Sequence, residues 1–173
     1  MVRLSVRQAL TQLQIELDRN DAATVGAVEA ALSLALPGPG RAVGGGRQVR
    51  IIWAGPERWL VVLPNSEDGA AEALAASLRQ AGATVVDQSH GRCVIRMRGD
   101  MARAVLAKGT AIDLDPVHFA GDDVRLTEAF HAAVILDARD DGAAIDIFVA
   151  RGFAQGFWGS VTDAAAEYGY QVG

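Results

Sequence analysis

The chain has 173 residues, of which 50% are hydrophobic and 21% charged, and its formal net charge is −5. This composition excludes a disordered chain and is typical of one or at most two small globular domains. A chain of this size hides roughly 70% of the surface that it exposes when unfolded, so it can build a core without disulfides or a structural metal. The single cysteine, Cys93, agrees, because it has no partner for a disulfide within the chain.

The acidic balance argues against binding to nucleic acid or anionic lipid, which both favour a basic surface. No stretch approaches the roughly 18 apolar residues of a membrane span, and residues 1–7 lack the apolar region of a secretory signal. We therefore expect a cytoplasmic protein whose partners are small molecules or proteins. All sixteen basic residues except Lys108 are arginines. Arginine suits protein interfaces better than lysine, although a genome rich in G and C gives the same bias.

The first predicted elements are a strand and a helix. Residues 11–17 alternate apolar and polar side chains at the period of a half-buried strand. Asn20-Asp21 begins a helix over 22–36 that Pro37 stops. The glycine-rich stretch 37–46 is expected to be a flexible loop.

A hairpin, a helix and a strand complete the first half of the chain. Gly55-Pro56 supplies the hairpin turn, and Asn65 and Ser66 can cap the helix. The expected ranges are 49–54 and 59–63 for the hairpin, 68–80 for the helix and 83–87 for the strand.

The second half repeats this order without a residue-level repeat. Its expected elements are strand 92–98, helix 101–107, strands 126–136 and 145–149, helix 152–168 and a closing strand at 170–172. The two halves predict an α+β protein of two consecutive βαββαβ-like units packed as one domain.

Candidate catalytic groups are sparse. His90, His118 and His131 are too scattered for a recognisable metal spacing, and His131 is expected in the core or on a strand face. Ser89 and His90, near Asp87, invite a catalytic triad, but neighbours in an extended segment point to opposite faces. A turn joining two strands is the simpler interpretation.

Three further features have both a structural and a functional interpretation. Cys93 lies in an alternating strand and is expected to be an inert core thiol rather than a nucleophile. Asp113 and Asp115 share a face if extended, as an acid/base pair or cation site requires, but Pro116 favours a turn. The glycines at 38, 40 and 44 follow a helix and precede a strand, which is the reverse of a dinucleotide-binding loop.

The tryptophans Trp53, Trp59 and Trp158 either fill the core or contact another subunit. Because acid/base, metal and phosphate motifs are almost absent, the sequence favours a binding module or a subunit over a free-standing enzyme.

Five segments between about residues 51 and 168 follow one another in a characteristic order and spacing. They are Trp53–Leu60, Asp87–Arg92, Val105–Gly109, Ile112–Phe119 and Val149–Ala154. Together they resemble the gamma subunit of bacterial heterotetrameric sarcosine oxidase. The predicted family-like core is 49–168, whereas residues 1–48 match only loosely. One departure is Gly152, where the family usually has serine, although glycine is also an acceptable helix cap.

The resemblance implies a single domain over 1–173 whose fold is related to the N-terminal region of the folate-binding T-protein of the glycine cleavage system. It also implies a non-catalytic subunit with alpha, beta and delta partners, chiefly alpha. The complex oxidatively demethylates sarcosine to glycine and hydrogen peroxide, with formaldehyde or 5,10-methylenetetrahydrofolate as the one-carbon product. FAD, FMN, NAD, tetrahydrofolate and zinc are expected on the other subunits, and no catalytic, cofactor or metal residue is expected here.

Two alternatives remain open. The first is the equivalent subunit of a related dehydrogenase for another N-methyl amino acid, such as N-methylglutamate. The second is a free-standing tetrahydrofolate-binding protein in which Asp113 or Asp115 holds the pterin. For the subunit hypothesis, we predict partner contacts at the planar side chains of Arg58, Trp59, Arg151 and Trp158.

Overall fold

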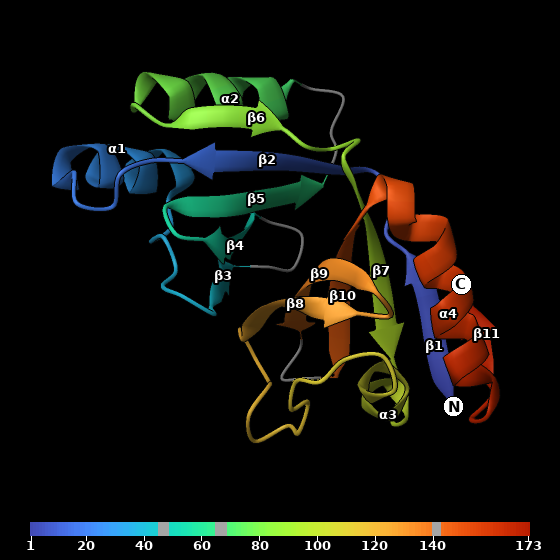
Figure 1. Cartoon of the computed structure of the whole chain (residues 1–173). Helices are drawn as coiled ribbons and strands as arrows, with labels where there is room; N and C mark the ends of the chain where they lie inside the picture. The colour runs from blue at the N-terminus through green and yellow to red at the C-terminus, as the bar shows by residue number, and fades with distance from the viewer. Residues whose placement is uncertain (45–48, 65–68, 140–142) are drawn as a thin grey trace. The chain divides into compact units, whose positions relative to one another are not determined.

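The computed structural model describes residues 1–44, 49–64, 69–139 and 143–173, and Figure 1 traces its elements. The chain divides into two compact units, one of Met1–Gln8 with His90–Gly173 and the other of Ala9–Ser89. We call them the six-stranded unit and the five-stranded unit after their sheets. Both combine helices with mainly antiparallel strands, which confirms the α+β class. The packing of the units as one domain stays a prediction.

The five-stranded unit has the strand order β3-β4-β5-β2-β6, and all of its strand pairs are antiparallel. Its helices α1 and α2 contact each other and pack on one face of the sheet. The elements are β2 (Leu10–Glu16), α1 (Ala22–Leu32), β3 (Ala42–Gly44), β4 (Arg50–Gly55), β5 (Arg58–Pro64), α2 (Ala70–Gln80) and β6 (Thr84–Asp87).

The six-stranded unit has the order β11-β1-β7-β10-β9-β8, in which only the β1–β11 pair is parallel. Its elements are β1 (Val2–Val6), β7 (Arg92–Arg98), α3 (Ala102–Ala107), β8 (Val124–Ala129), β9 (Ala132–Arg139), β10 (Ala144–Ala150), the short 3₁₀ helix η2 (Arg151–Phe153), α4 (Ala154–Ala166) and β11 (Tyr170–Val172). The closing strand β11 confirms its prediction.

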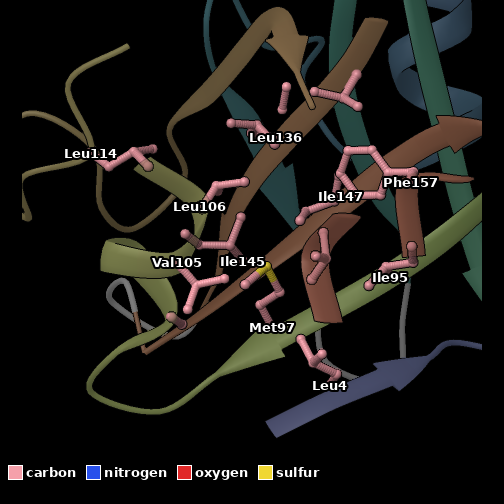
Figure 2. Packing of buried hydrophobic residues seen from close by; sticks show 14 of the residues in the cluster. Leu4, Ile95, Met97, Val105, Leu106, Leu114, Leu136, Ile145, Ile147 and Phe157 are labelled. Carbon is pink, nitrogen blue, oxygen red and sulfur yellow. The ribbon is translucent and has the colours of Figure 1, made fainter. Parts of the chain in front are cut away.

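Each unit has its own hydrophobic core, between its helices and one face of its sheet. In the six-stranded unit, alternate residues of β1, β7, β9 and β10 meet α3 and α4. Figure 2 shows Met97 and Ile145 from the sheet near Val105 and Leu106 from α3. In the five-stranded unit, Trp59 is fully buried against residues of α1 and α2. Burial alternates along β1, which buries one face, whereas most residues of β5, β9 and β10 are buried on both faces and their sequences are nearly continuous apolar runs.

Helix α1 is shorter than predicted. Asp21 caps its start by accepting hydrogen bonds from the backbone N–H groups of Ala23 and Thr24. The helix ends at Leu32 rather than at residue 36, because Ser33 adopts a left-handed conformation with φ 54°. The carboxylate of Glu29 then accepts the N–H of Leu36 at 2.7 Å, which stabilises the non-helical turn before Pro37.

Two predicted loops or ends contain strands. β1 at the N-terminus was not predicted, although Val2 and Leu4 alternate with polar neighbours and are buried. Within the predicted flexible loop 37–46, residues 42–44 form β3, which pairs with β4. Residues 45–46 of that predicted loop lie outside the described residues. Asn65 and Ser66, which were predicted to cap a helix, also lie outside them.

The predicted strand 126–136 is wrong, because the structure has a hairpin there. Strands β8 and β9 meet at Phe130 and His131, which have φ values of 46° and 64°. Two consecutive residues with positive φ make a tight turn whose twist suits a hairpin. His131 is fully exposed at this turn, so its predicted place in the core or on a strand face is also wrong.

Candidate functional site

The face of the six-stranded sheet that points away from α3 and α4 carries a row of polar residues. The strand register pairs Ser5 with Arg96, Arg96 with Asp146, and Asp146 with Asp137. Residues directly opposite in an antiparallel ladder share a face. The flanking residues Met97 and Ile145 therefore point to the other face, where they join the core under the helices.

Asp146 holds two arginines on this face. Its carboxylate is 1% exposed and accepts two hydrogen bonds from Arg96, at 2.6 Å from Nε and 2.7 Å from Nη2. Nη1 of Arg7 donates to the same carboxylate at 3.2 Å. A bidentate guanidinium–carboxylate pair fixes both groups in one plane. Sequence reasoning missed this site, although a lone carboxylate among the apolar residues of β10 was a signal.

Arg7 is held at an electrostatic cost. Burial lowers the pKa of its guanidinium, and the nearby positive charges of Arg96 and Arg139 lower it further, whereas Asp146 opposes the shift. The nearby pair of Arg139 and Asp137 is longer, at 3.5 Å, but is almost completely shielded from water. This face of the sheet is therefore crowded with cations around two carboxylates.

A hollow of about 510 Å³ lies beside this row, where β1, β7 and β11 adjoin. Arg3 and Arg98 are directly opposite each other across the β1–β7 ladder, and both are exposed. The hollow is lined by Arg3, Leu4, Ser5, Arg96, Arg98, Gln171, Val172 and Gly173. Its ionisable side chains are all arginines.

A second hollow, of about 440 Å³, lies beside α3 and is lined in part by Asp100, Arg103 and Pro116. Next to it, the loop before β8 is anchored by Phe119, which is fully buried. The guanidinium carbons of Arg103 and Arg125 lie 5.7 and 5.5 Å from the centre of its ring. These cation–π contacts give the loop a fixed shape.

Asp113 and Asp115 serve this loop as turn-forming residues. Asp113 accepts the backbone N–H of Asp115, and Asp115 accepts that of Val117. Hydrogen bonding from the N–H of Asp115 and from the His118 side chain, 2.5 Å away, lowers the pKa of Asp113. Both carboxylates are thus engaged within the loop, as the turn interpretation expects. Among the described residues, no three His, Cys, Asp or Glu side chains are placed to hold a metal ion.

The Asp87–Arg92 segment is a turn between strands. Asp87 accepts the backbone N–H of Ser89 at 2.8 Å, and the Ser89 hydroxyl accepts the N–H of Gln12 at 3.0 Å. The backbone carbonyl of His90 accepts a hydrogen bond from Nε of Arg151. Cys93, which follows this turn, is partly buried against the core of the six-stranded unit.

Gly44, from the glycine-rich string, lies in β3 with φ 78°, and a Cβ there would collide with the carbonyl oxygen of Val49. It therefore permits a close approach of two backbone segments and forms part of no strand–loop–helix phosphate cradle.

Arg58 and Trp59 are neighbours on β5 with opposite environments. Arg58 is exposed and pairs with Glu16 across the β2–β5 ladder, with Nε 2.8 Å from Oε1. Trp59 is 0% exposed, and its indole N–H donates to the Pro37 carbonyl at 2.9 Å. The indole thus fills the core, and a partner contact by Trp59 finds no support in the structure.

Arg151 and Trp158 lie at the start and in the middle of the η2–α4 segment. Arg151 is exposed; its Nε donates to the His90 carbonyl at 2.7 Å, and its backbone N–H donates to Gly91. It therefore ties the start of the helix to the β6–β7 turn. Trp158 is partly buried against the core. Arg58, Arg151 and Trp158 retain accessible surface, so their partner contacts stay predictions.

The only lysine joins the ends of two helices. Nζ of Lys108 donates to the Ala164 carbonyl at 2.8 Å, lies 2.6 Å from Oε2 of Glu167, and lies 4.6 Å from the centre of the Tyr168 ring. The adjacent Gly109 leaves room for the ring of Phe130, which a Cβ would strike. The Lys108-Gly109 pair therefore has a structural role.

Comparison with known proteins shows where such a chain belongs. A family model described as sarcosine oxidase, gamma subunit family, matches residues 16–167. The chain belongs to this family. The family match includes residues 16–48, which are most of the N-terminal part that matched only loosely by its sequence segments. Sarcosine oxidase subunit gamma of Arthrobacter sp. is 32% identical over 111 residues, which cover 64% of this gamma-family chain and 54% of the relative. The chain thus spans about half the length of this relative.

Solved structures agree with this assignment. A chain of heterotetrameric sarcosine oxidase from Corynebacterium sp. U-96, in complex with pyrrole 2-carboxylate, matches with a TM-score of 0.87 and 25% identity over 96% of this chain and 85% of that chain. The aminomethyltransferase T of the glycine cleavage system from Bartonella henselae matches with a TM-score of 0.68 and 15% identity, over 99% of this chain and 47% of that chain. The second match shows a shared fold, as the predicted relation to the T-protein expects.

In addition, no helix among the described residues is long and apolar enough to cross a bilayer.

Proposed function

We propose that this chain is the non-catalytic gamma subunit of a heterotetrameric sarcosine oxidase. The observation that carries the proposal is the family match over 16–167. The fold likeness to a chain of a heterotetrameric sarcosine oxidase, over 96% of this chain, adds to it. The complex would oxidatively demethylate sarcosine to glycine and hydrogen peroxide. The one-carbon product would be formaldehyde, or 5,10-methylenetetrahydrofolate when tetrahydrofolate accepts it.

The roles of the resemblance-bearing residues support an accessory function. Asp87 and Asp113 fix turns through backbone hydrogen bonds. Lys108, at the end of α3, donates a hydrogen bond to the last turns of α4, and Arg151 donates one from the start of η2 to the β6–β7 turn. A catalytic nucleophile or base needs a free reacting atom within reach of substrate, and these side chains are instead committed to holding the fold.

The partners in this proposal are alpha, beta and delta subunits, with alpha as the chief contact. FAD, FMN, NAD, tetrahydrofolate and zinc would reside on those subunits, where they would supply the redox and one-carbon chemistry. This chain would contribute surface and rigidity to the assembly. Arg58, Arg151 and Trp158 are the proposed contact residues on its accessible surface.

The test is to assay the isolated chain and the assembled complex side by side. The isolated chain should show no flavin absorbance and no sarcosine-dependent hydrogen peroxide formation, whereas the complex should show both. A panel of N-methyl amino acids, including N-methylglutamate, distinguishes sarcosine oxidase from a related dehydrogenase. Calorimetry of the isolated chain with tetrahydrofolate tests the free-standing folate-binding alternative. Tight binding would contradict the subunit proposal.

A further inference from the structure

Strand β11 forms one edge of the six-stranded sheet, on the outer side of β1 (Figure 1). The backbone N–H of Val2 donates to the carbonyl of Gly169 at 3.0 Å, and the N–H of Gly173 donates to the carbonyl of Leu4 at 3.0 Å. The backbone groups of successive strand residues point alternately to the two sides of the strand. The residues between these anchors at positions 170 and 172 therefore turn their N–H and C=O groups away from β1, toward the outside of the sheet.

The outer backbone groups of β11 are exposed donors and acceptors. Among the residues that the structure describes, none forms a hydrogen bond with the outer N–H and C=O groups of Tyr170 or Val172. In each of the other three edge strands, at least one carbonyl accepts a hydrogen bond from a nearby side chain. These contacts are Arg50 to Gly44 of β3 at 2.7 Å, Arg79 to Val85 of β6 at 3.4 Å, and Thr110 to Glu128 of β8 at 2.7 Å. Proteins usually protect a sheet edge against pairing with another chain, and β11 is an exception.

The side chains of β11 also favour pairing with another strand. Tyr170 and Val172 have high strand propensity and are 40% and 62% exposed. The register pairs them with Val2 and Leu4, which belong to the core under the helices, so they lie on that face of the sheet. The strand contains neither a charge nor a proline, the two residue types that most often block an edge.

Charge favours a different protein over a second copy of this chain as the added strand. Gln171 is opposite the exposed Arg3 on the other face of the sheet. Neighbouring strands lie about 4.8 Å apart, so a carboxylate beside Gln171 on an added strand is within reach of the long Arg3 side chain. A second copy, paired antiparallel through the same edge, would instead bring two Arg3 side chains of like charge toward each other.

We propose that an extended segment of another subunit binds to β11 and continues the six-stranded sheet as a further strand. Its backbone completes the outer hydrogen bonds of Tyr170 and Val172. Its side chains are apolar beside these two residues and acidic beside Gln171, opposite Arg3. The inference rests on the proposed function, which supplies the partner, and it adds the kind of contact that the partner makes.

The first experiment compares amide hydrogen exchange in the isolated full chain and in the complex assembled with the alpha, beta and delta subunits. In the isolated chain, the amides of Tyr170 and Val172 should exchange as unprotected backbone. Assembly should slow their exchange at least about tenfold, because strand addition gives each N–H a partner. Mass spectrometry of the peptide over 168–173 measures the change.

The second experiment measures the concentration of chain that half-saturates a mixture of the other three subunits. Val172→Pro removes an outer N–H and should weaken assembly at least about tenfold. Tyr170→Lys leaves the backbone intact but charges the edge, and it should weaken assembly as well. Arg3→Glu should weaken assembly more at low than at high salt. Leu126→Pro, at the 41% exposed Leu126 of β8 on the opposite edge of the same sheet, is the matched control and should leave assembly unchanged. Circular dichroism of each isolated variant checks that it is folded.

The inference is overturned if the wild-type chain assembles while the exchange of its 168–173 peptide stays the same, and Val172→Pro and Tyr170→Lys assemble as well as the wild type. A dimer of the isolated chain in which this peptide is protected would also overturn it, because a second copy would then occupy the edge. Both results leave the proposed function intact, since assembly itself is observed. Failure of the wild-type chain to assemble would instead refute the proposed function and this inference together.

Discussion

At the scale of single residues, Asp146 balances the positive charges on the face of the six-stranded sheet that points away from α3 and α4. Its carboxylate is buried and pairs with Arg7 and Arg96. Removing one partner of such a group leaves the other charges poorly solvated, and this loss exceeds the net stabilisation that the intact pair supplies. The network therefore fixes the strand register more than it adds stability.

Replacing Asp146 by Asn should lower the free energy of unfolding by about 2–3 kcal/mol. This figure is below the usual range of about 3–5 kcal/mol for breaking a buried pair, because Arg7 and Arg96 keep partial access to water. Urea denaturation followed by circular dichroism measures the change. Glu16→Gln, which breaks the exposed pair with Arg58, is the control and should cost at most about 1 kcal/mol. Equal effects of the two variants would contradict the role given to Asp146.

Adjacent residues on β5 offer a second test at this scale. Trp59→Ala should cost about 3–5 kcal/mol, because it leaves a cavity in the core of the five-stranded unit. Arg58→Ala should cost under about 1 kcal/mol, because its ion pair is solvated. Thermal unfolding of both variants checks the difference. A mild effect of Trp59→Ala would show that the indole is not the core residue that its burial indicates.

At the scale of elements, the bounds of helices and strands were predicted correctly where the cap or turn residues follow the usual preferences. Strand alternation and a capping aspartate predicted β2, β7 and the start of α1 to within one residue, because these signals are local. The β8–β9 turn was missed because Phe130 and His131 replace the Asn or Gly that such turns prefer. The ring of Phe130 packs edge-on against Phe157, with ring centres 5.7 Å apart, so a tertiary contact selects the residue there.

The strain at this turn gives a stabilising prediction. His131 has φ 64° and a fully exposed side chain. His131→Gly should therefore raise the free energy of unfolding by about 0.5 kcal/mol, because glycine adopts positive φ without steric cost. His131→Val should lower it, since a β-branched residue fits this conformation badly. Thermal denaturation of the two variants should shift in opposite directions, and shifts of the same sign would contradict the turn geometry.

The cap of α1 gives a pH dependence. The hydroxyl and backbone N–H of Thr24, with the N–H of Ala23, lower the pKa of Asp21. A carboxyl whose folded pKa is depressed contributes stability above its unfolded pKa of about 3.9, and this contribution disappears as the pH falls through the folded value. Asp21→Asn keeps a capping oxygen without titrating. The melting temperature of the variant should thus fall less than that of the wild type between about pH 6 and about pH 3. Identical falls would contradict the assignment.

At the scale of the whole molecule, the sequence predicted two similar α+β units, but not their boundaries. Residues 1–8 belong to the six-stranded unit. The reason is that β1 pairs with β7 and β11, which lie about ninety or more residues further along the chain. Local periodicity carries no information on such long-range pairing. The row of polar residues on the six-stranded sheet was missed for the same reason. Arg96 and Arg98 are visible in the alternation of β7, but only the register brings Ser5, Asp146 and Arg3 beside them.

Membership of the gamma-subunit family rests on the family match over residues 16–167. The proposed role as a subunit depends in addition on whether the surface of this chain binds the other subunits. In both units the helices cover one sheet face with a hydrophobic core, and the family-like segments fix turns and helix ends. Under the proposed function, a protein built in this way would contribute shape and charge to an assembly, and any effect on oxidation would pass through the other subunits.

The most direct test of this account is to co-express the tagged chain with the alpha, beta and delta subunits of its complex and to weigh the purified species by native mass spectrometry. We predict one heterotetramer with each subunit once, in which the flavin absorbance and the sarcosine-dependent hydrogen peroxide formation co-purify with the tag. Recovery of the tagged chain alone, with the other three subunits assembled and active without it, would contradict the account.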